Sequence, residues 1–562
     1  MSNQQIVIIS GKTCTGKTGL AALLQKRYGF KIISTRDILL DQLGKKAARA
    51  TRDQLIKAGI ELDKKTRSRW VAQKVASIAK GLSPDEGVVV DHVSSPKQVE
   101  AFRKQFGPNL IHVHLYASTE TLHRRYKKSE GNAKNAPTYD KIDHLTDDKK
   151  IVKLKNDADV RIFTDRTDDN DTLVRVAAHL HLFSSPDVRC VDVLVGGQYG
   201  SEGKGNIVAY LAREYDVLVR VGGPNAGHTV ATPKGKFTHH LLPSGSGFTN
   251  GKLLLGPGIT ISVAGLLKEI KDTGIRRGRL FIDPQASIIE DEDAQEEKQG
   301  VVGAIASTGS GSGAAKARRI LHRGNSKKMV RLAKDVKELA PYIGSTADQL
   351  ELAYLANKSI LLEGTQGSGL SLYHGQYPHV TSRDTNVAGC LAEAGISPSR
   401  VRKILMVVRT TPIRVANPDG QKGNTSGRLK HETTFTNIAE IAGLNPDEVN
   451  AAEKTSTTHR DRRVGWFEWD QFRRACNLNA PTDIVLTFVD YFKAINQNAR
   501  RFEQLHDDTI KFIEELERVA QAPVSLINTR FPKKVADFLD LRSIIDRRNW
   551  TARPNIRQDH AG

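Results

Sequence analysis

Two glycine-rich loops in the middle of the chain carry residue types that bind phosphate and move protons. The first, residues 196–205 (GGQYGSEGKG), follows an apolar run and precedes a predicted helix. Glycines at such a junction let backbone N–H groups surround a phosphate, and Lys204 adds a fixed positive charge. The second, residues 221–229 (VGGPNAGHT), also follows an apolar run and contains His228, which can act as acid, base or electrophile near neutral pH. The two loops together predict chemistry on a nucleotide.

A third loop, at residues 11–18 (GKTCTGKT), has the complete phosphate-binding pattern G-x-x-x-x-G-K-[ST]. A short apolar strand is predicted at residues 5–10 and a helix after the loop, which is the context that this pattern requires. Backbone amides would wrap the β-phosphate, Lys17 would reach the β- and γ-oxygens, and Thr18 would ligate Mg²⁺. The residues expected to form this nucleotide site are Gly11, Gly16, Lys17 and Thr18.

The remainder of this N-terminal part resembles the nucleoside monophosphate kinases among phosphate-loop proteins. The resemblance makes Arg36 the candidate clamp for an acceptor phosphate and Asp91, at the end of a predicted strand, an indirect partner of magnesium. Arg124 and Arg125 open a predicted lid, from which they would reach the transferring phosphates. Two interpretations stay open, a kinase and a nucleotide sensor without transfer activity.

The two central loops, read as QYGSEGKG followed by GGPNAGHT, resemble adenylosuccinate synthetase, a ligase that joins L-aspartate to a purine nucleotide. The resemblance extends over roughly residues 190 to 545. It implies that a nucleoside triphosphate, GTP or ATP, phosphorylates O6 of the purine with Mg²⁺ bridging its phosphates, and that the aspartate amine then displaces phosphate at C6. His228 would stabilise charge on O6 and the transferring phosphoryl group, and Lys204 would hold the donor.

The resemblance also implies a set of ligand contacts on motifs further along the chain. The aspartate-binding loop is matched by residues 454–463 (KTSTTHRDRR), where two hydroxyls and an arginine fork suit a dicarboxylate. Arg318 would cross a homodimer interface to the partner's nucleotide. The expected aspartate contacts are Ser456, Thr457, Thr458 and Arg460, and the expected metal ligands in this part are Ser201 and Gly227. The expected nucleotide contacts are Gly200, Glu202, Gly203, Gly205, Asn225, Ala226, Gly227, Thr308, Arg318, Gln366, Thr381, Arg462 and Asp490.

One departure from the family pattern affects the catalytic chemistry. Ser201 stands where the family carries an aspartate that removes the N1 proton of the purine and ligates Mg²⁺. A serine hydroxyl is a poor base at neutral pH and a weak metal ligand. Three interpretations therefore remain: a purine nucleotide ligase of the usual type, a 2-aminoadenylosuccinate-type synthetase acting on GMP or dGMP as in a phage branch of the family, and a catalytically impaired purine nucleotide sensor. A serine would leave space for a 2-amino group.

A second departure affects the donor. The family reads guanine with a Lys-x-Asp stretch after a strand, whereas this chain has Phe488-Val489-Asp490. Asp490 retains the carboxylate that would accept hydrogen bonds from guanine, but the lysine is replaced by Phe488. GTP and ATP thus both remain candidate donors.

The elements that must position these loops are short strands rich in β-branched residues, and each strand is followed by a helix. This alternation predicts an α/β fold with two P-loop-like domains, each a mostly parallel sheet flanked by helices. We expect a P-loop nucleotide kinase-like domain at residues 1–185 and a ligase domain at residues 190–562, joined near the polar turn at residues 184–187. A length of 562 residues is too great for one core.

Composition narrows the class of protein. The net charge of +21 suggests either nucleic-acid binding or a basic surface that handles polyanionic nucleotides. Aromatic residues make up only 6% and no nucleic-acid-binding motif is present, which favours the second alternative. Four dispersed cysteines, an N-terminus without a secretory pattern and the lack of any apolar run near the ~20 residues of a membrane span predict a cytoplasmic protein.

Overall fold

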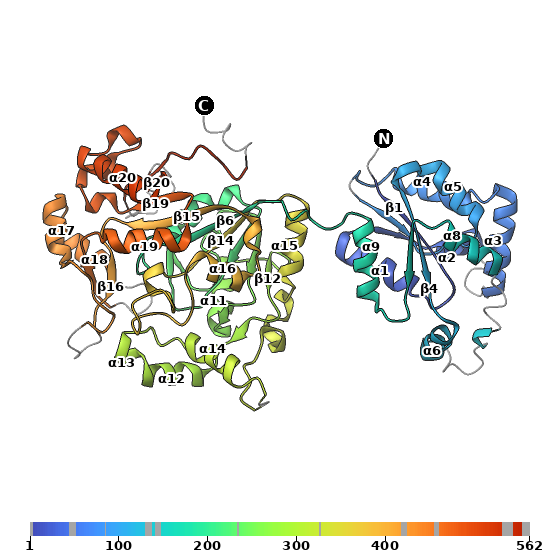
Figure 1. Ribbon diagram of the computed structural model, residues 1–562, viewed down its shortest axis with the longest axis horizontal. Coiled ribbons are helices and arrows are strands. Elements are labelled where there is room, and N and C mark those ends of the chain that lie inside the picture. Colours follow the sequence, from blue (N-terminus) through green and yellow to red (C-terminus); the bar gives the residue numbers. More distant parts are fainter. Residues whose placement is uncertain are drawn as a thin grey trace. The chain divides into compact units, whose positions relative to one another are not determined.

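The computed structural model places two compact units in the chain, residues 1–183 and 184–562. Each contains a mainly parallel sheet with helices on both faces, which confirms the predicted α/β class (Figure 1). The structure describes residues 4–43, 52–84, 86–129, 138–140, 148–232, 235–324, 327–417, 424–454, 460–530 and 543–553.

The N-terminal unit has a five-stranded parallel sheet in the order β2-β3-β1-β4-β5. Its strands are β1 (Ile6–Ser10), β2 (Lys31–Ile33), β3 (Val88–Val90), β4 (Leu110–Tyr116) and β5 (Val160–Phe163). The helices named below are α1 (Lys17–Tyr28), α2 (Thr35–Leu43), α4 (Trp70–Ala79), α5 (Pro96–Phe106), α6 (Thr119–Ser129) and α9 (Asp169–His179).

The central strand β1 is buried on both faces because its side chains alternate between two apolar layers. Ile6 and Ile8 pack in one cluster with helices α4 and α5, whereas Val7 and Ile9 pack in another with α1 and α9. The strand is therefore fixed on both sides. Its carboxyl end leads directly into the loop of residues 11–18, and α1 follows that loop.

The C-terminal unit has a nine-stranded sheet in the order β12-β10-β7-β14-β6-β15-β19-β20-β21. All neighbours pair in parallel except β20 and β21, which are antiparallel. The strands are β6 (Val191–Gly196), β7 (Val217–Arg220), β10 (Lys252–Leu255), β12 (Leu280–Ile282), β14 (Ile360–Glu363), β15 (Val401–Arg409), β19 (Asp483–Thr487), β20 (Val524–Asn528) and β21 (Ile544–Asp546).

The core of this unit lies in two layers, one on each face of the sheet. On one face, Val191, Val193 and Val195 of β6 pack with helices α15, α16, α19 and α20, and on the other Leu194 packs with α10 and α11. Strands covered on both faces read as continuous apolar runs, as they do here. The helices are α10 (Lys204–Leu211), α11 (Val263–Thr273), α15 (Thr346–Leu355), α16 (Val387–Ala394), α19 (Trp469–Asn479) and α20 (Asp507–Ala520).

Smaller elements complete the C-terminal unit. They comprise the hairpin β8–β9, a three-stranded antiparallel sheet β16-β18-β17, and helices α12, α13, α14, α17 and α18 (Figure 1). Their bounds are β8 (His228–Thr232), β9 (Gly235–His239), β16 (Ile413–Val415), β17 (Glu432–Thr433), β18 (Arg462–Gly465), α12 (Asp291–Gly300), α13 (Val302–Ile305), α14 (Ser312–Leu321), α17 (Phe435–Ala442) and α18 (Pro446–Ala452).

Ion pairs and a hydrogen bond attach strand β21 and the residues after it to the rest of the C-terminal unit. Arg548, buried, forms an ion pair of 2.6 Å with Glu214 and one of 2.7 Å with Asp546. Thr551 donates a further hydrogen bond to Glu214 at 2.8 Å. These contacts hold β21 against β20 and cover an edge of the sheet.

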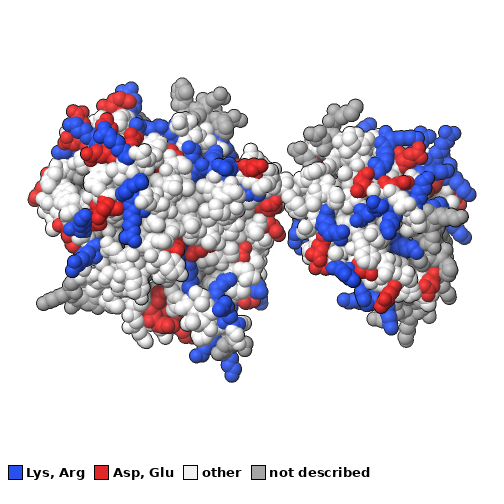
Figure 2. All heavy atoms as spheres, viewed as in Figure 1, with Lys and Arg blue, Asp and Glu red and all other residues white. Residues whose placement is uncertain are grey.

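The surface charge is distributed rather than gathered into one stripe on the face that Figure 2 shows. Lys and Arg side chains lie there in separate groups, with Asp and Glu among them and wide neutral areas between. Within the described part of the chain, every helix is too short or too polar to cross a membrane.

Candidate active site

The first glycine-rich loop joins β6 to α10 and is organised by a buried ion pair. Helix α10 begins at Lys204, two residues before the predicted start. Oε2 of Glu202 lies 2.5 Å from Nζ of Lys204, and Oε1 accepts hydrogen bonds from the N–H groups of Gln198 (3.1 Å) and Gly200 (2.8 Å). Glu202 thus shapes the loop from inside and fixes Lys204, whereas Ser201, the residue before Glu202, is exposed.

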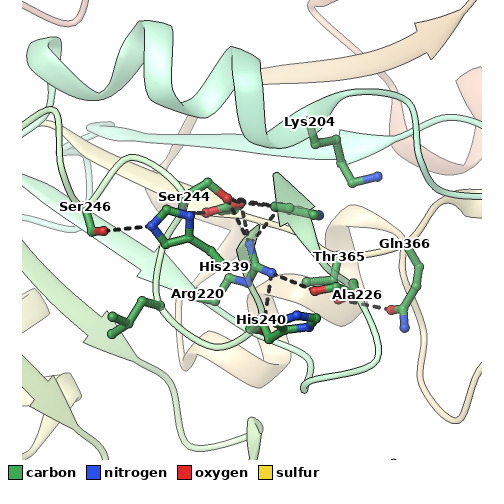
Figure 3. A network of polar contacts seen from close by, with 12 residues as sticks. Lys204, Arg220, Ala226, His239, His240, Ser244, Ser246, Thr365 and Gln366 are labelled. Atoms are coloured by element: carbon green, nitrogen blue, oxygen red, sulfur yellow. Dashed lines mark hydrogen bonds and ion pairs between the residues drawn. The ribbon is translucent and has the colours of Figure 1, made fainter. Parts of the chain in front are cut away.

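The second loop ends in a buried group of four side chains, Arg220, His228, Ser244 and Glu363, which we call the His228 cluster. Arg220 ends β7, Glu363 ends β14 and His228 begins β8. Nδ1 of His228 lies 2.5 Å from Oε1 of Glu363 and 2.8 Å from NH1 of Arg220. Arg220 and the Ser244 hydroxyl both donate to the same Oε1 atom. Figure 3 shows these contacts around the labelled Arg220 and Ser244, with Lys204 nearby.

The cluster is electrostatically tuned by burial and by its own ion pair. Burial raises the pKa of the Glu363 carboxyl, but Arg220, His228 and Ser244 together outweigh that effect and hold it at about 2. Burial, helped by the positive charge of Arg220, lowers the pKa of His228 to about 3 against the opposing effect of Glu363. Before a ligand binds, Glu363 is therefore ionised and the imidazole is neutral at pH 7.

The turn after β14 packs directly on the first loop. A Cβ atom at Gly196 would lie 2.5 Å from the backbone oxygen of Gln366, so only glycine allows this approach. The amide of Gln366 donates to Thr381 at 3.2 Å and accepts from Thr365 at 3.0 Å. Gln366 and Thr381, both predicted as nucleotide contacts, are thereby brought together beside the loop.

The second loop also contacts the glycine loop of residues 305–313. The side-chain oxygen of Asn225 accepts hydrogen bonds from Ser310 and, at 3.1 Å, from Ser312. The Thr308 hydroxyl is buried and makes no hydrogen bond to any described residue. A buried hydroxyl of this kind fits the predicted contact with a nucleotide.

Acidic side chains occupy the positions around this glycine loop. Glu297 accepts hydrogen bonds from the backbone N–H groups of Gly311 (2.8 Å) and Gly313 (2.5 Å) at the start of α14. Arg318 forms an ion pair of 2.6 Å with Asp293 of the same chain. Its predicted contact with a partner's nucleotide stays a prediction, and it would require this pair to open.

A buried triad connects the first loop to the aspartate region. Arg409 ends β15 and pairs with Glu453 at 2.8 Å, and Arg462 pairs with the other oxygen of Glu453 at 2.7 Å. Burial raises the pKa of Glu453, but the two arginines lower it to about 2. The Arg409 guanidinium also lies 4.0 Å from the ring centre of Phe488 and donates to the backbone oxygen of Ser201 at 3.4 Å.

Asp490 follows β19 and is buried. One of its oxygens accepts a hydrogen bond from Gln497 at 3.2 Å, and the other has no partner among the described residues. Burial raises the pKa of Asp490 to about 6, against the lowering effect of Gln497 and nearby amides. An open buried carboxylate oxygen fits the predicted contact with a nucleotide base.

Part of the predicted aspartate loop lies outside the described residues, namely Ser456, Thr457 and Thr458. The two ends of that loop are brought together by an antiparallel bridge between Lys454 and Asp461. Arg460 is half-buried next to this bridge. Its contact with aspartate stays a prediction.

The predicted residues converge because β7, β14, β6, β15 and β19 are consecutive neighbours in the parallel sheet. Parallel strands present their carboxyl ends at one edge, which is where open α/β sheets bind ligands. The side chains delivered to this edge are those of the first loop, the His228 cluster, Gln366, Arg409 and Asp490. Sequence reasoning missed Arg220, Glu363 and Arg409. Each is a charged residue that ends an apolar strand, which is the signal that would have found them.

The loop of residues 11–18 in the N-terminal unit forms a second candidate site. Nζ of Lys17 lies 2.9 Å from the backbone oxygen of Gly11, and Thr18 follows at the start of α1. Asp91 accepts a hydrogen bond from the Thr35 N–H at 3.0 Å, and burial raises its pKa.

The predicted lid arginines of this unit both lie on α6. Arg125 donates to the backbone oxygen of Thr164 at 2.6 Å, after β5, and to Cys14 in the loop at 3.4 Å. Arg124 contacts Thr121 of its own helix at 3.4 Å. Arg125 therefore links the phosphate loop to the end of the sheet, and the contact of either arginine with phosphate stays a prediction.

Each of the two units matches the model of a known protein family. The model of the adenylosuccinate synthetase family matches residues 193–330 and 323–497, and the model of an AAA domain matches residues 7–145. Adenylosuccinate synthetase of Methanocaldococcus jannaschii is 34% identical over 347 residues, covering 60% of this chain and 93% of the relative. Adenylosuccinate synthetase of Pyrococcus horikoshii is 34% identical over 365 residues, covering 64% of this chain and 98% of the relative.

Two solved structures are similar to the C-terminal unit. One is succinoaminodeoxyadenylate synthetase (PurZ) of cyanophage S-2L, bound to dGMP and to dATP as an energy donor. It has 28% identity and a TM-score of 0.51, and the match covers 64% of this chain and 95% of that one. The other is fully ligated adenylosuccinate synthetase of Plasmodium falciparum, with 21% identity, a TM-score of 0.54 and coverage of 64% and 100%. The second likeness concerns the fold alone.

Proposed function

Because this chain belongs to the adenylosuccinate synthetase family, we propose that its C-terminal unit joins the amine of L-aspartate to C6 of a purine nucleoside monophosphate, with hydrolysis of a nucleoside triphosphate. The observation that carries the proposal is the convergence of Lys204, His228 and Gln366 at one edge of the sheet, on loops that follow three neighbouring strands. A phosphate-holding cation, an imidazole and an amide at one edge are the groups that this reaction needs.

The proposed reaction has two steps. O6 of the purine attacks the γ-phosphorus, N1 loses its proton and the nucleoside diphosphate leaves. The aspartate amine then attacks C6, the C6–O6 bond breaks, and phosphate leaves with a proton from the amine nitrogen. Ser201 is too weak a base for the N1 proton, so we assign that proton to the imidazole of His228. Negative charge from bound phosphates favours the protonated ring, which then stabilises charge on O6 and the phosphoryl group. Lys204 and the loop amides hold the donor.

For the acceptor, we propose a 2-aminopurine nucleotide, GMP or dGMP, used at least as well as IMP. Ser201 supports this choice because its side chain is smaller than an aspartate and its hydroxyl can accept a hydrogen bond from a 2-amino group. Glu202 cannot replace the missing carboxylate, since its oxygens are taken by Lys204 and by loop amides. The cyanophage relative, whose structure contains dGMP, supports the same choice.

For the donor, we propose ATP or dATP rather than GTP. Guanine presents two adjacent donors, N1–H and N2–H, which pair best with both oxygens of a carboxylate. Gln497 already occupies one oxygen of Asp490, and the remaining open oxygen suffices for the single exocyclic amine of adenine. Phe488, in place of the family's lysine, removes a charged contact to guanine, and the Arg409 guanidinium covers one face of its ring.

The side-chain and backbone oxygens at both sites are of the kind that Mg²⁺ binds, with the Ser201 hydroxyl a weaker ligand than the family's aspartate. Mg²⁺ takes oxygen ligands and usually binds through one or two protein groups together with substrate phosphates and water. The hydroxyl of Thr18 in the N-terminal unit, and the Ser201 hydroxyl with the Gly227 carbonyl in the C-terminal unit, would hold it. When bound, the ion would neutralise charge on the transferring phosphates.

For the N-terminal unit, we propose nucleoside triphosphate binding with transfer of the γ-phosphoryl group to a small acceptor. The complete loop of residues 11–18 ahead of α1 and the match to an AAA domain support this proposal. Nucleotide binding without transfer is the alternative. Incubation of a Lys204→Ala variant with labelled ATP and candidate nucleotides, read by product mass, separates the two.

We further propose that the ligase is a homodimer with shared sites, with Arg318 reaching the partner's nucleotide. Mixing two inactive variants, Arg318→Ala and Lys204→Ala, tests the arrangement, because a mixed dimer would contain one site in which both residues are wild type. Recovery of activity on mixing is expected. Full activity of Arg318→Ala by itself, or a monomer by light scattering, would contradict it.

The central test is product analysis of the full chain. The protein is incubated with L-aspartate, Mg²⁺, a donor (ATP or GTP) and an acceptor (IMP, GMP or dGMP). The products are then separated and identified by mass spectrometry. We expect the aspartate adduct of dGMP or GMP with ATP as donor. A product from IMP alone would contradict the acceptor proposal, and no adduct with any purine would favour a nucleotide sensor.

A further inference from the structure

The carboxylate of Glu363 is the point on which the His228 cluster converges. Its Oε1 atom contacts Nδ1 of His228, NH1 of Arg220 and the hydroxyl of Ser244, and its Oε2 atom accepts the Ser244 N–H at 2.8 Å. All four side chains are buried. Glu363 thus uses both oxygens within the protein.

These contacts decide which nitrogen of the His228 ring carries hydrogen. A guanidinium can only donate and an ionised carboxylate can only accept. A bare Nδ1 would place a lone pair 2.5 Å from the carboxylate oxygen, which is repulsive, so Nδ1 must carry the hydrogen and donate it to Glu363. The NH1 group of Arg220 donates to the same oxygen, which accounts for its closeness to Nδ1.

The second nitrogen of the ring, Nε2, makes no hydrogen bond to any residue that the structure describes. The start of α10 approaches His228 closely: a Cβ atom added at Gly205 would lie 2.8 Å from Cβ of His228, so only glycine leaves room for the side chain here. In the neutral ring, Nε2 therefore keeps an open lone pair.

We propose that Glu363 is a positioning residue of the ligase: it fixes the Nδ1–H tautomer of His228 and so makes Nε2 the nitrogen that meets the bound nucleotide. The inference rests on the proposed function for the role of His228, but the tautomer itself is a property of the protein without substrate. The hydrogen bond made by one ring nitrogen generally sets the state of the other. Without Glu363, Nδ1 would face the Arg220 guanidinium, which can only donate, and the Ser244 hydroxyl at 3.2 Å, which can donate or accept, so neither would fix Nδ1–H.

The first experiment measures the tautomer directly. Nitrogen NMR of protein labelled with ¹⁵N-histidine distinguishes a protonated from an unprotonated ring nitrogen, and the signal that disappears in His228→Asn identifies the residue. We expect a protonated Nδ1 and a bare Nε2 for His228 at pH 7 without nucleotide. A protonated Nε2 with a bare Nδ1 would overturn the proposal, whether or not the protein turns out to be a ligase.

The second experiment separates positioning from simple stability. Glu363→Gln has the same shape, but its amide cannot accept from all four donors. We expect kcat to fall by about 100-fold or more, the scale of general acid–base catalysis, with KM for the nucleotide changed by less than about threefold. Glu214→Gln is the matched control, because Glu214 also forms a buried pair with an arginine, Arg548, away from the loops. It should lower the melting temperature and leave kcat unchanged.

Two kinetic outcomes are decisive. If Glu363→Gln folds, shows a mixed His228 tautomer by NMR and loses kcat, the positioning role is supported. If it retains wild-type kcat, or loses activity only to the degree that Glu214→Gln does, Glu363 has a structural role alone. If Glu363→Gln does not fold, the tautomer of the wild-type protein still decides the question.

Discussion

Glu202 and Lys204 form a fully buried ion pair inside the first glycine-rich loop, with 2.5 Å between Oε2 and Nζ. A buried charge is costly unless it is paired, so each residue accounts for the presence of the other. The pair also holds the lysine in place before any nucleotide binds. A nucleotide phosphate that takes up Lys204 would have to share it with Glu202, which limits how far the lysine moves.

Removing the cation of the N-terminal loop should leave the ligase intact. Lys17→Ala is expected to abolish nucleotide binding by the N-terminal unit, because Lys17 is the cation that such a loop directs to the phosphates. Ligase turnover should stay within about twofold, since the C-terminal unit has loops of its own. Both are measured on the full chain, with the exposed Lys26→Ala on α1 as control. Loss of ligation in folded Lys17→Ala would show that the two sites are coupled.

Replacing His228 should impair chemistry more than binding. His228→Asn is expected to lower ligase kcat by about 10²–10³-fold, the typical loss when one preorganised group at a developing charge is removed. Affinity for the purine nucleotide should change little, because phosphate and base contacts lie on other residues. Steady-state kinetics together with nucleotide titration provide the test. Full turnover by the variant would exclude His228 from the mechanism.

The side chain at position 201 should determine which purine nucleotide the ligase prefers as acceptor. Ser201→Asp is expected to shift preference from dGMP toward IMP by about 10- to 200-fold, because a carboxylate adds a base and crowds a 2-amino group. Competition between the two nucleotides, read by product mass, measures the ratio. Ser201→Asn is the matched control, since it adds the same bulk without the charge. Equal preference in wild type and Ser201→Asp would refute the assignment.

Asp490 should make the free energy of unfolding depend on pH between about 4 and 6. Its pKa is about 6 in the folded protein, against 3.8 for an ordinary aspartate. The folded state therefore holds a proton that the unfolded chain releases, so the stabilisation is complete below about pH 4 and is lost as pH rises through 6. Asp490→Asn should remove this dependence, which amounts to at most about 3 kcal/mol. Urea unfolding of both proteins at pH 4.5 and 7 measures it. A parallel pH dependence in the two would contradict the argument.

The loops of the site were predictable because their signals are local. Glycines, a lysine and a histidine within ten residues of an apolar strand identify a phosphate-binding turn whatever the rest of the chain does. The partners of those residues were not predictable in the same way. Glu363 lies 135 residues after His228, and Glu453 lies 44 residues after Arg409. Only the strand order brings them together, and strand order has no local signal.

The predicted contacts of Arg318 and Arg125 show a different limit. Their motif positions suggested phosphate contacts, yet Arg318 pairs with Asp293 and Arg125 with the backbone after β5. The sequence around an arginine in a basic run does not indicate whether the arginine pairs with a carboxylate or carbonyl of its own chain or stays available for a phosphate. Sequence therefore identifies cations near a phosphate site more readily than it identifies which cation is free.

The antiparallel strand β21 has a practical consequence for truncation. Strand β20 has its parallel neighbour on one side and only β21 on the other. A protein shortened before residue 543 would expose the N–H and C=O groups of Leu526, Ile527 and Asn528 that β21 now covers, on a fully buried strand. Open edges of this kind recruit strands from other molecules and lead to aggregation. The short β21, held by Arg548, thus protects this one edge of the sheet from pairing with a strand of another molecule.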